Sequence, residues 1–568
     1  MNLWDAQSGT GERDGSARVA RAILLRVLVP FAVGIVLARN FETVPALWST
    51  LFALLFSALA FLWMGASRGW RPWAWTAAFS LSLAFMGLAW GGLRTTPAMS
   101  HRAALPPREA FLHLRVERVF EGDKWGRTRG IAHVESAAHP LGELGGQSVL
   151  FSINDAVSLD KGARFYAKGL LVRRALDSEA GSFDEWLERS GVYFNFSRAV
   201  LLEEVESPPR WMGRMNGLRE YLSKSLAAGS DAMPQIRAML PAMFLGQRRL
   251  LDAGDGELFR TTGMMHLFAV SGLHVGLVAL TVEAILAFLR MGTRWRVGGG
   301  LLILLAYVLL IGAPPSAVRA FIMLLFHRAG LLWGRPTRGL PALSASAVAV
   351  LVWNPAQLFD IGARLSYGIV AGILFYGVPL GRMLNRRMAL YEDLPAGSLS
   401  RGRRALLWAK GWLCTGAASC AGAFLIGAPL SVQYFGVFAP GSLLLNLLLV
   451  PVALLCVAAA SLSAMFYLAA LLPVCGSLAA IGEFFSRAGW VCALFMHEAI
   501  DALARVPFLF ARCRFPVEWM GSALALGLLA WVLVLNGSWL RMRLRLWFMP
   551  FAFLFAVAGL CAAFTRAS

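Results

Sequence analysis

Repeated apolar runs of about twenty residues constrain this chain most strongly. Each approaches the ~20 residues that an α-helix needs to cross a bilayer. The hydrophobic fraction is 58% and the charged fraction 15%, against roughly 45–50% and 25% in soluble domains. These values exclude a water-soluble enzyme, a disordered chain and a fibrous protein, and they predict a polytopic α-helical membrane protein. The expected crossings, about thirteen, are 19–38, 44–65, 72–93, 263–289, 297–313, 316–333, 340–353, 357–381, 405–427, 441–470, 473–500, 518–536 and 546–565.

The stretch 94–235 interrupts this apolar pattern. Short segments of alternating apolar and polar residues occur there, bounded by Gly, Asp and Pro, which is typical of a small antiparallel β barrel or sandwich. Apolar residues at helical spacing over 211–226 predict an interfacial helix that leads back to the membrane. The expected strands lie at 111–120, 129–136, 147–153 and 164–172. The expected domains are three membrane helices in 1–93, a β domain in 94–208, amphipathic helices in 209–262 and a membrane domain in 263–568.

The net charge of +20 lies almost entirely outside 94–235, which holds 19 basic and 18 acidic residues. Among the later connections an alternating set is basic, whereas those at 312–316, 354–357 and 428–440 have no Lys or Arg. This positive-inside pattern places the N-terminus in the cytoplasm and 94–235 outside it. The charge excess therefore indicates membrane orientation and is not a direct sign of a nucleic-acid partner.

One apolar segment carries polar residues that an ordinary crossing lacks. His266 and His274 lie eight residues apart, with Ser271, Gly272 and Gly276 around them. Polar groups at membrane depth are costly unless they face a cavity or a partner, and Gly permits close packing or a break in the helix. Two interpretations stay open. The histidines line or gate a conduit, sharing one face if the helix is continuous, or they bond to backbone carbonyls and hold a broken helix.

This segment resembles the signature of the ComEC family, the inner-membrane channels for DNA uptake in natural competence. The residues in register are Phe259, Arg260, Thr262, Gly263, His266, Leu267, Ala269, Val270, Ser271, Gly272, Leu273, His274, Val275 and Gly276. The resemblance implies a competence-type membrane domain in the cell inner membrane. It also implies a role in passing single-stranded DNA into the cytoplasm.

Three further stretches resemble family segments in the family's order, at 312–323, 354–370 and 428–452. The matching residues are Pro315, Ser316, Arg319 and Ala320; Asn354, Pro355, Leu358, Gly362, Leu365 and Ser366; and Pro429, Phe435, Gly436, Asn446 and Pro451. The middle stretch departs from the family pattern at Arg364, where the family usually has Gln. An arginine there places a fixed charge near a membrane segment.

The outer domain and a missing domain complete the resemblance. The stretch 179–196 is similar to the one that closes the family's OB-like β domain, with Phe183, Asp184, Leu187 and Gly191 in register. Family members commonly continue into a metallo-β-lactamase-like nuclease with H-x-H-x-D-H metal ligands. No two of the 8 histidines here are spaced i, i+2, so we expect no metal, no cofactor and no catalytic residue, with any nuclease absent or supplied separately.

Several charged residues have two interpretations. Arg319 and Arg364 lie within apolar runs, where a cation must face protein or water. Either they contact the phosphates of a passing strand, or they pair with carboxylates such as Glu283 or Asp360 or reach the interface. Glu283, two turns past His274, is a counter-ion or a proton-linked group.

The outer domain has candidate DNA contacts of its own. They are Trp125, Arg127, Arg129, Arg173 and Arg174, with Phe165 and Tyr166 as further stacking aromatics. Basic and aromatic side chains together suit a single strand. Against this, the domain is nearly neutral, whereas a dedicated nucleic-acid domain is usually basic.

The favoured function is conduction of single-stranded DNA during natural transformation. The chain has no GxxxxGK[ST] phosphate loop, so the driving force must come from elsewhere. Expected partners are the single strand, the lipid bilayer, a separate nuclease, a DNA receptor and a cytoplasmic motor. The alternatives are a transporter of a small solute, lipid or envelope precursor on the same fold, and a scaffold of the uptake machinery that conducts nothing.

Overall fold

The chain forms two compact units, the first from Met1–His101 and Arg319–Leu374, the second from Arg102–Val318 and Phe375–Ser568. The structure is a computed structural model. It describes residues 13–40, 46–65, 72–94, 106–120, 127–137, 144–154, 159, 161–174, 184, 187, 191–203, 205–230, 234–247, 250–268, 270–332, 334, 339–388, 400–472, 476–506, 509–517, 519–535 and 549–557.

The first unit is helical and packs through close backbone contacts. A Cβ placed on Gly34 would lie 1.9 Å from the Ala84 carbonyl oxygen, so only glycine permits this approach of α1 to α3. The Trp90 indole N–H donates to the Val352 carbonyl oxygen at 3.1 Å and joins α3 to α12. The elements are α1 (Arg13–Asn40), α2 (Ala46–Gly65), α3 (Pro72–Arg94), α12 (Gly339–Trp353), the 3₁₀ turn η5 (Pro355–Leu358) and α13 (Ile361–Gly372).

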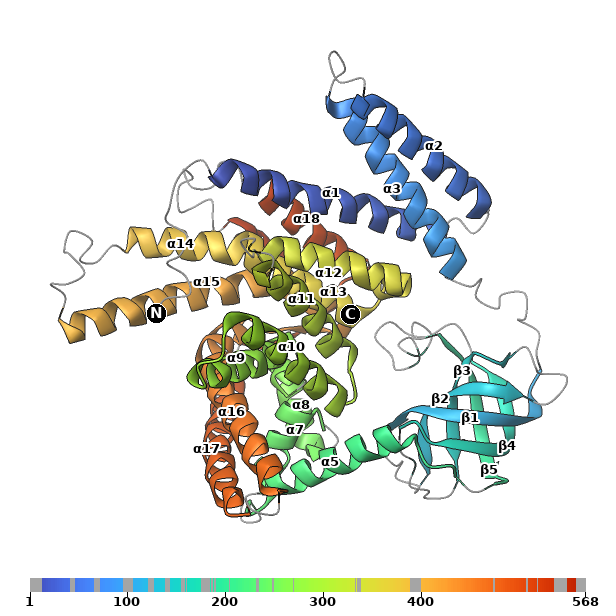
Figure 1. Ribbon diagram of the computed structural model, residues 1–568, viewed down its shortest axis with the longest axis vertical. Helices are drawn as coiled ribbons and strands as arrows, with labels where there is room; N and C mark the ends of the chain where they lie inside the picture. Colours follow the sequence, from blue (N-terminus) through green and yellow to red (C-terminus); the bar gives the residue numbers. More distant parts are fainter. Residues whose placement is uncertain are drawn as a thin grey trace. The chain divides into compact units, whose positions relative to one another are not determined.

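The second unit begins with a closed five-stranded barrel (Figure 1). Its strands are β1 (Arg108–Phe120), β2 (Thr128–Ala137), β3 (Ser148–Ile153), β4 (Arg164–Arg173) and β5 (Val192–Leu201), in the order β1-β2-β3-β5-β4. The pair β3–β5 is parallel and the others are antiparallel. Alternate β1 residues point inward, with Leu112, Leu114 and Val116 buried, as period-two alternation requires. The four expected strands are confirmed, and β5 is the fifth.

The helices after the barrel also follow the expected positions. The interfacial helix predicted at 211–226 is α5 (Arg210–Ala227). Next come α6 (Pro234–Arg237), α7 (Met239–Leu245), α8 (Ala253–Thr261), α9 (Gly272–Phe288), α10 (Thr293–Leu310) and α11 (Pro315–Leu332), which runs from the second unit into the first. A π turn at Ile373–Gly377 leads to α14 (Val378–Arg387), followed by α15 (Arg401–Phe435), α16 (Ser442–Ala470), α17 (Leu478–Ala504) and α18 (Met520–Leu535).

Pro429 and Pro451 lie inside helices rather than between them. The expected connection at 428–440 was wrong in its first half, because α15 continues through Pro429 to Phe435. Pro451 likewise lies within α16. Proline removes one backbone hydrogen bond, and packed membrane helices accommodate that loss. Gly436, with φ of 64°, then ends α15 in the left-handed conformation. The short strand β6 (Val437–Phe438) follows and pairs with β7 (Ala511–Arg512), which comes after α17.

Among the described residues, 8 helices are long and apolar enough to cross a membrane. Shorter apolar helices occupy 47–62, 339–353 and 520–532. The chain is therefore a polytopic helical membrane protein with an inserted β barrel. The expected total of about thirteen crossings stays a prediction.

Candidate functional site

The signature segment is a broken helix. After α8, Gly263 adopts a φ of 73°, a short 3₁₀ turn follows at Met265–Leu267, and α9 begins only after Ser271. His266 and His274 therefore belong to different elements and do not share the face of one continuous helix. The segment is therefore interrupted, and a role of the histidines in lining or gating a conduit stays a prediction.

His266 uses both ring nitrogens to hold the turn. Its Nδ1 lies 2.8 Å from the Gly263 carbonyl oxygen, and its Nε2 lies 3.2 Å from the side-chain oxygen of Asn446 in α16. A carbonyl only accepts, so a neutral imidazole carries its proton on Nδ1. Nε2 then accepts, which is satisfied when the Asn446 amide turns its NH₂ group toward the ring.

His274 is fully buried and shapes the start of α9. Its Nδ1 lies 2.9 Å from the Ser271 hydroxyl and accepts from the Ser271 backbone N–H at 3.3 Å. The Ser271 hydroxyl in turn accepts from the backbone of His274, which forms a capping box. Because Nδ1 is the acceptor, the neutral ring carries its proton on Nε2. The serine and histidine together satisfy a helix start within an apolar segment.

Residues of two other family-like stretches meet the signature segment. Asn446 reaches it through His266, and the Ser316 hydroxyl at the start of α11 donates to the Val270 carbonyl oxygen at 2.7 Å. Broken helices leave backbone carbonyls that need donors at membrane depth. Ser316 supplies one such donor across 46 residues of sequence.

The turn before α11 is held by two cations from outside the membrane domain. Arg219 of α5 donates to the Ile311 carbonyl oxygen at 3.1 Å, and Lys161 of the barrel donates to the Gly312 carbonyl oxygen at 2.9 Å. Gly312 and Ala313 both have positive φ, at 86° and 51°. Burial lowers the pKa of Lys161, and the nearby Arg219 charge lowers it further. Pro315 then starts α11.

Arg319 is enclosed by residues of the 354–370 stretch within the first unit. Its side chain is 4% exposed, and its Nη1 lies 3.6 Å from Asp360 Oδ2 and 3.1 Å from Gln357 Oε1. Asp360 also accepts from the Ala363 backbone N–H at 2.8 Å and caps α13. A Cβ on Gly362 would lie 3.1 Å from Asp360 Oδ2 and 3.2 Å from Arg319 Nη2, so glycine leaves room for the pair.

The remaining membrane-domain candidates have local partners. Arg364 donates to the Leu358 carbonyl oxygen at 3.1 Å, and its guanidinium lies 5.9 Å from the centre of the Phe359 ring. Glu283 pairs with Arg296 of α10 at 3.3 Å. Arg260 pairs with Glu257 one turn earlier. Gly276 is different, because a Cβ placed there meets nothing within 4 Å.

The barrel candidates expected from the sequence have different surroundings. Arg174 is 7% exposed and pairs with Asp184 and Asn195. Arg129 faces Ser152 across β2 and β3, and Arg173 lies at the end of β4. Trp125 lies outside the described residues. Phe165 is buried in the barrel core and Tyr166 stacks on His113 with ring centres 4.1 Å apart.

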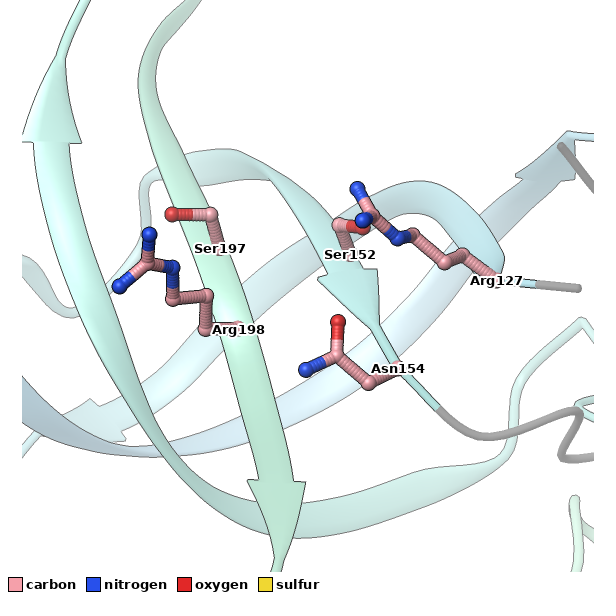
Figure 2. Close-up of a pocket in the computed structure, with 5 residues that line it drawn as sticks. All are labelled: Arg127, Ser152, Asn154, Ser197 and Arg198. Atoms are coloured by element: carbon pink, nitrogen blue, oxygen red, sulfur yellow. The ribbon is translucent and has the colours of Figure 1, made fainter. Parts of the chain in front are cut away.

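One polar cavity of about 280 Å³ opens on the barrel. Its lining residues are Arg127, Ser152, Asn154, Ser197 and Arg198. In Figure 2, Ser152 and Asn154 lie between Arg127 on one side and the β5 residues Ser197 and Arg198 on the other. Only Arg127 was expected from the sequence. Arg198 was missed because it occupies an ordinary polar position of an alternating strand. No sequence motif predicts the bulge that exposes its side chain.

No group of three or more His, Cys, Asp or Glu side chains placed to hold a metal ion occurs in the part of the chain that the structure describes. The second unit instead contains a broken helix that Ser271 and His274 cap, together with a cationic cavity on the barrel. The first unit contains the ion pair of buried Arg319 with partly exposed Asp360.

Comparison with known proteins gives one family. The family model described as "Competence protein" matches residues 243–564. The chain is 31% identical to ComE operon protein 3 of Bacillus subtilis over 33% of this chain and 24% of that protein. It is 29% identical to competence protein ComA of Neisseria gonorrhoeae over 24% of this chain and 21% of that protein.

A further relative is the uncharacterized protein YcaI of Escherichia coli, 26% identical over 24% of this chain and 19% of that protein. The chain thus spans about a quarter or less of the curated relatives it matches. No solved structure matches.

Proposed function

Because this chain belongs to the competence protein family, we propose that it conducts single-stranded DNA across the inner membrane during natural transformation. The observation that carries the proposal is the broken helix at Gly263–Ser271. Interrupted helices occur at membrane depth where they are buried in protein or line a water-filled cavity, and transporters place such breaks at their substrate path. A polyanion needs a wet, cation-bearing route through low dielectric.

The proposed topology follows from the charge pattern. About thirteen crossings with basic loops inside put the N-terminus in the cytoplasm and 94–235 outside it. We propose that the barrel is an OB-like module, which its five strands and their β1-β2-β3-β5-β4 order support. In this arrangement incoming DNA meets the barrel before the membrane domain.

The chain's own part in this proposal is conduction rather than bond cleavage. A separate nuclease, a DNA receptor and a cytoplasmic motor complete the proposed machinery, with the lipid bilayer and the single strand as direct partners. The names of two curated relatives, ComE operon protein 3 and competence protein ComA, support a competence role. The motor is needed because the sequence has no phosphate loop.

Gly276 offers a sharp test of conduction. Because a Cβ there meets nothing within 4 Å, Gly276→Ala keeps the fold and improves helix propensity by about 1 kcal/mol. Gly276→Trp fills the open space beside the break. If this face lines the route, the tryptophan variant blocks entry of labelled DNA into the cytoplasm while the alanine variant, expressed at the same level, transports normally.

The assay is transformation with labelled DNA in a deletion strain complemented by each variant. Loss of cytoplasmic DNA on deletion, restored by wild type and by Gly276→Ala, supports the proposal. Unchanged uptake after deletion removes the DNA-channel function. Restored uptake by Gly276→Trp removes this face from the route. Normal DNA entry combined with loss of a small envelope precursor after deletion favours the alternative of a solute transporter.

A further inference from the structure

The cavity on the barrel is built around a β-bulge in β5. Along β3 and β5, Phe151 faces Phe196 and Ile153 faces Ala199, so two β5 residues, Ser197 and Arg198, stand opposite Ser152 alone. The β4–β5 register shifts at the same place. An extra residue of this kind bends the strand and re-aims its side chains.

Arg198 holds a backbone conformation that arginine rarely adopts. Its φ is 51°, in the left-handed region, where a side chain costs roughly 1–2 kcal/mol relative to the ordinary conformation. Glycine would occupy this position more easily. Such strain is found most often at binding and catalytic sites, and here its effect is to place a guanidinium at the rim of the cavity.

Within the described part of the chain, no carboxylate neutralises the charge of the cavity. Among the residues that the structure describes, Arg127 and Arg198 make no ion pair or hydrogen bond. This sets them apart from Arg115, Arg164 and Lys168, which pair with Glu135 or Glu109. Of the other lining residues, Ser152 offers a hydroxyl hydrogen and Asn154 offers amide hydrogens, whereas the Ser197 hydroxyl donates to the Leu170 carbonyl oxygen. The cavity therefore presents two cations and neutral donors to one anion.

We propose that this cavity binds a phosphodiester group of the DNA strand, an inference that rests on the proposed function. Its volume of about 280 Å³ lies just below the roughly 300–1,000 Å³ of sites for drug-sized ligands, which suits one phosphate and its water. Arginine and hydroxyl donors are the usual phosphate partners, and such contacts position a strand without reading its sequence. None of the described residues that line the cavity has an apolar side chain, whereas a membrane-docking surface carries apolar or aromatic anchors.

The test measures binding of fluorescent oligo(dT) to the full-length protein in detergent, by anisotropy over a range of salt concentrations. Arg198→Gly removes the charge while relieving the strained backbone, so its thermal midpoint stays at or above that of wild type. Arg127→Gln with Arg198→Gly is expected to weaken binding about tenfold or more. The slope of log K against log salt becomes shallower by about 0.7 for each phosphate that the variant no longer neutralises.

The matched control is Arg210→Gln with Arg214→Gln, which removes two exposed charges on α5 outside the cavity. It is expected to weaken binding less than about threefold. Equal losses in the two double variants, or none in the cavity variant, overturn the inference. Displacement of the oligonucleotide from wild type by dihexanoyl phosphatidylglycerol, without displacement by dihexanoyl phosphatidylcholine, would assign the cavity to lipid phosphate and also overturn it.

The cavity inference and the proposed function fail separately. If the cavity variant binds the oligonucleotide as tightly as wild type while deletion of the protein abolishes DNA entry, only the cavity inference is refuted. If binding depends on the cavity while deletion leaves DNA entry unchanged, the proposed channel function is refuted.

Discussion

Replacing Asp360 by Asn separates the charge of this residue from its capping role. Asp360 Oδ2 pairs with Arg319 at 3.6 Å and also caps α13 through the Ala363 N–H. Asparagine caps a helix as well as aspartate does, so only the ion pair is lost. At an effective dielectric constant of about 20, unit charges this far apart attract by about 4–5 kcal/mol. The Asp360 side chain is 39% exposed, so the net value is far smaller.

The two single variants should differ in a defined order. Asp360→Asn leaves the buried Arg319 guanidinium with Gln357 as its remaining acceptor among the described residues, which we expect to cost about 2–3 kcal/mol. Arg319→Met leaves a carboxylate that still caps α13 and reaches solvent, at about 1 kcal/mol. The double variant should lose only about 1 kcal/mol, because exchanging an ion pair with one buried partner for neutral groups is often nearly neutral. The two single losses then exceed the double loss by about 2–3 kcal/mol, which is the expected coupling energy.

Reversible unfolding in mixed dodecyl maltoside and SDS micelles, followed by tryptophan fluorescence, measures these free energies. The same four proteins are then tested for transformation. If the Arg319–Asp360 pair acts only by stabilising the structure, the double variant recovers transport together with stability. Additive losses of stability would refute this structural role. Transport that is lost in a stable Arg319→Met protein and is not restored in the double variant would refute it too, and would favour direct contact of Arg319 with the strand.

Two smaller perturbations test the broken helix itself. Gly263→Ala should lower stability by about 1 kcal/mol, because its φ of 73° disfavours a side chain; an unchanged thermal midpoint of the purified protein would contradict this. Ser271→Ala removes the cap of α9 and one partner of His274 and should cost about 0.5–2 kcal/mol. Ser271→Thr, which retains the hydroxyl, should restore most of that loss in the same unfolding measurement, and equal losses in both variants would exclude the capping role.

The elements of this fold were largely predictable because their causes are local. Hydrophobic runs of membrane length placed α16 and α17, and period-two alternation placed the barrel strands. The end of α15 was misplaced because Pro429 is a strong local signal for a break, and a packed helix overrides it. Resemblance to a family located the broken segment but did not decide between a continuous and an interrupted helix.

The contacts within the site were not predictable in the same way. His266 meets Asn446 across 180 residues of sequence, and no pattern near either residue specifies the partner. Asp360 was one of two carboxylates considered for Arg319, and only tertiary structure distinguishes it from Glu283, which pairs with Arg296. Long-range partners depend on how helices pack against each other. Hydrophobic periodicity predicts which face of a helix is buried, but it does not predict which residue of another helix that face contacts.

Net charge proves a poor guide to where an anion can bind. The barrel region is almost neutral in sequence, with 19 basic and 18 acidic residues in 94–235, which argued against DNA contact. In the folded barrel the positive and negative charges are not evenly matched at every position. Several barrel cations are paired with carboxylates. Arg127 and Arg198, unpaired among the described residues, meet at one cavity. Since attraction at close range depends on the nearest uncompensated charges, a neutral domain with this arrangement still offers a phosphate a defined binding position.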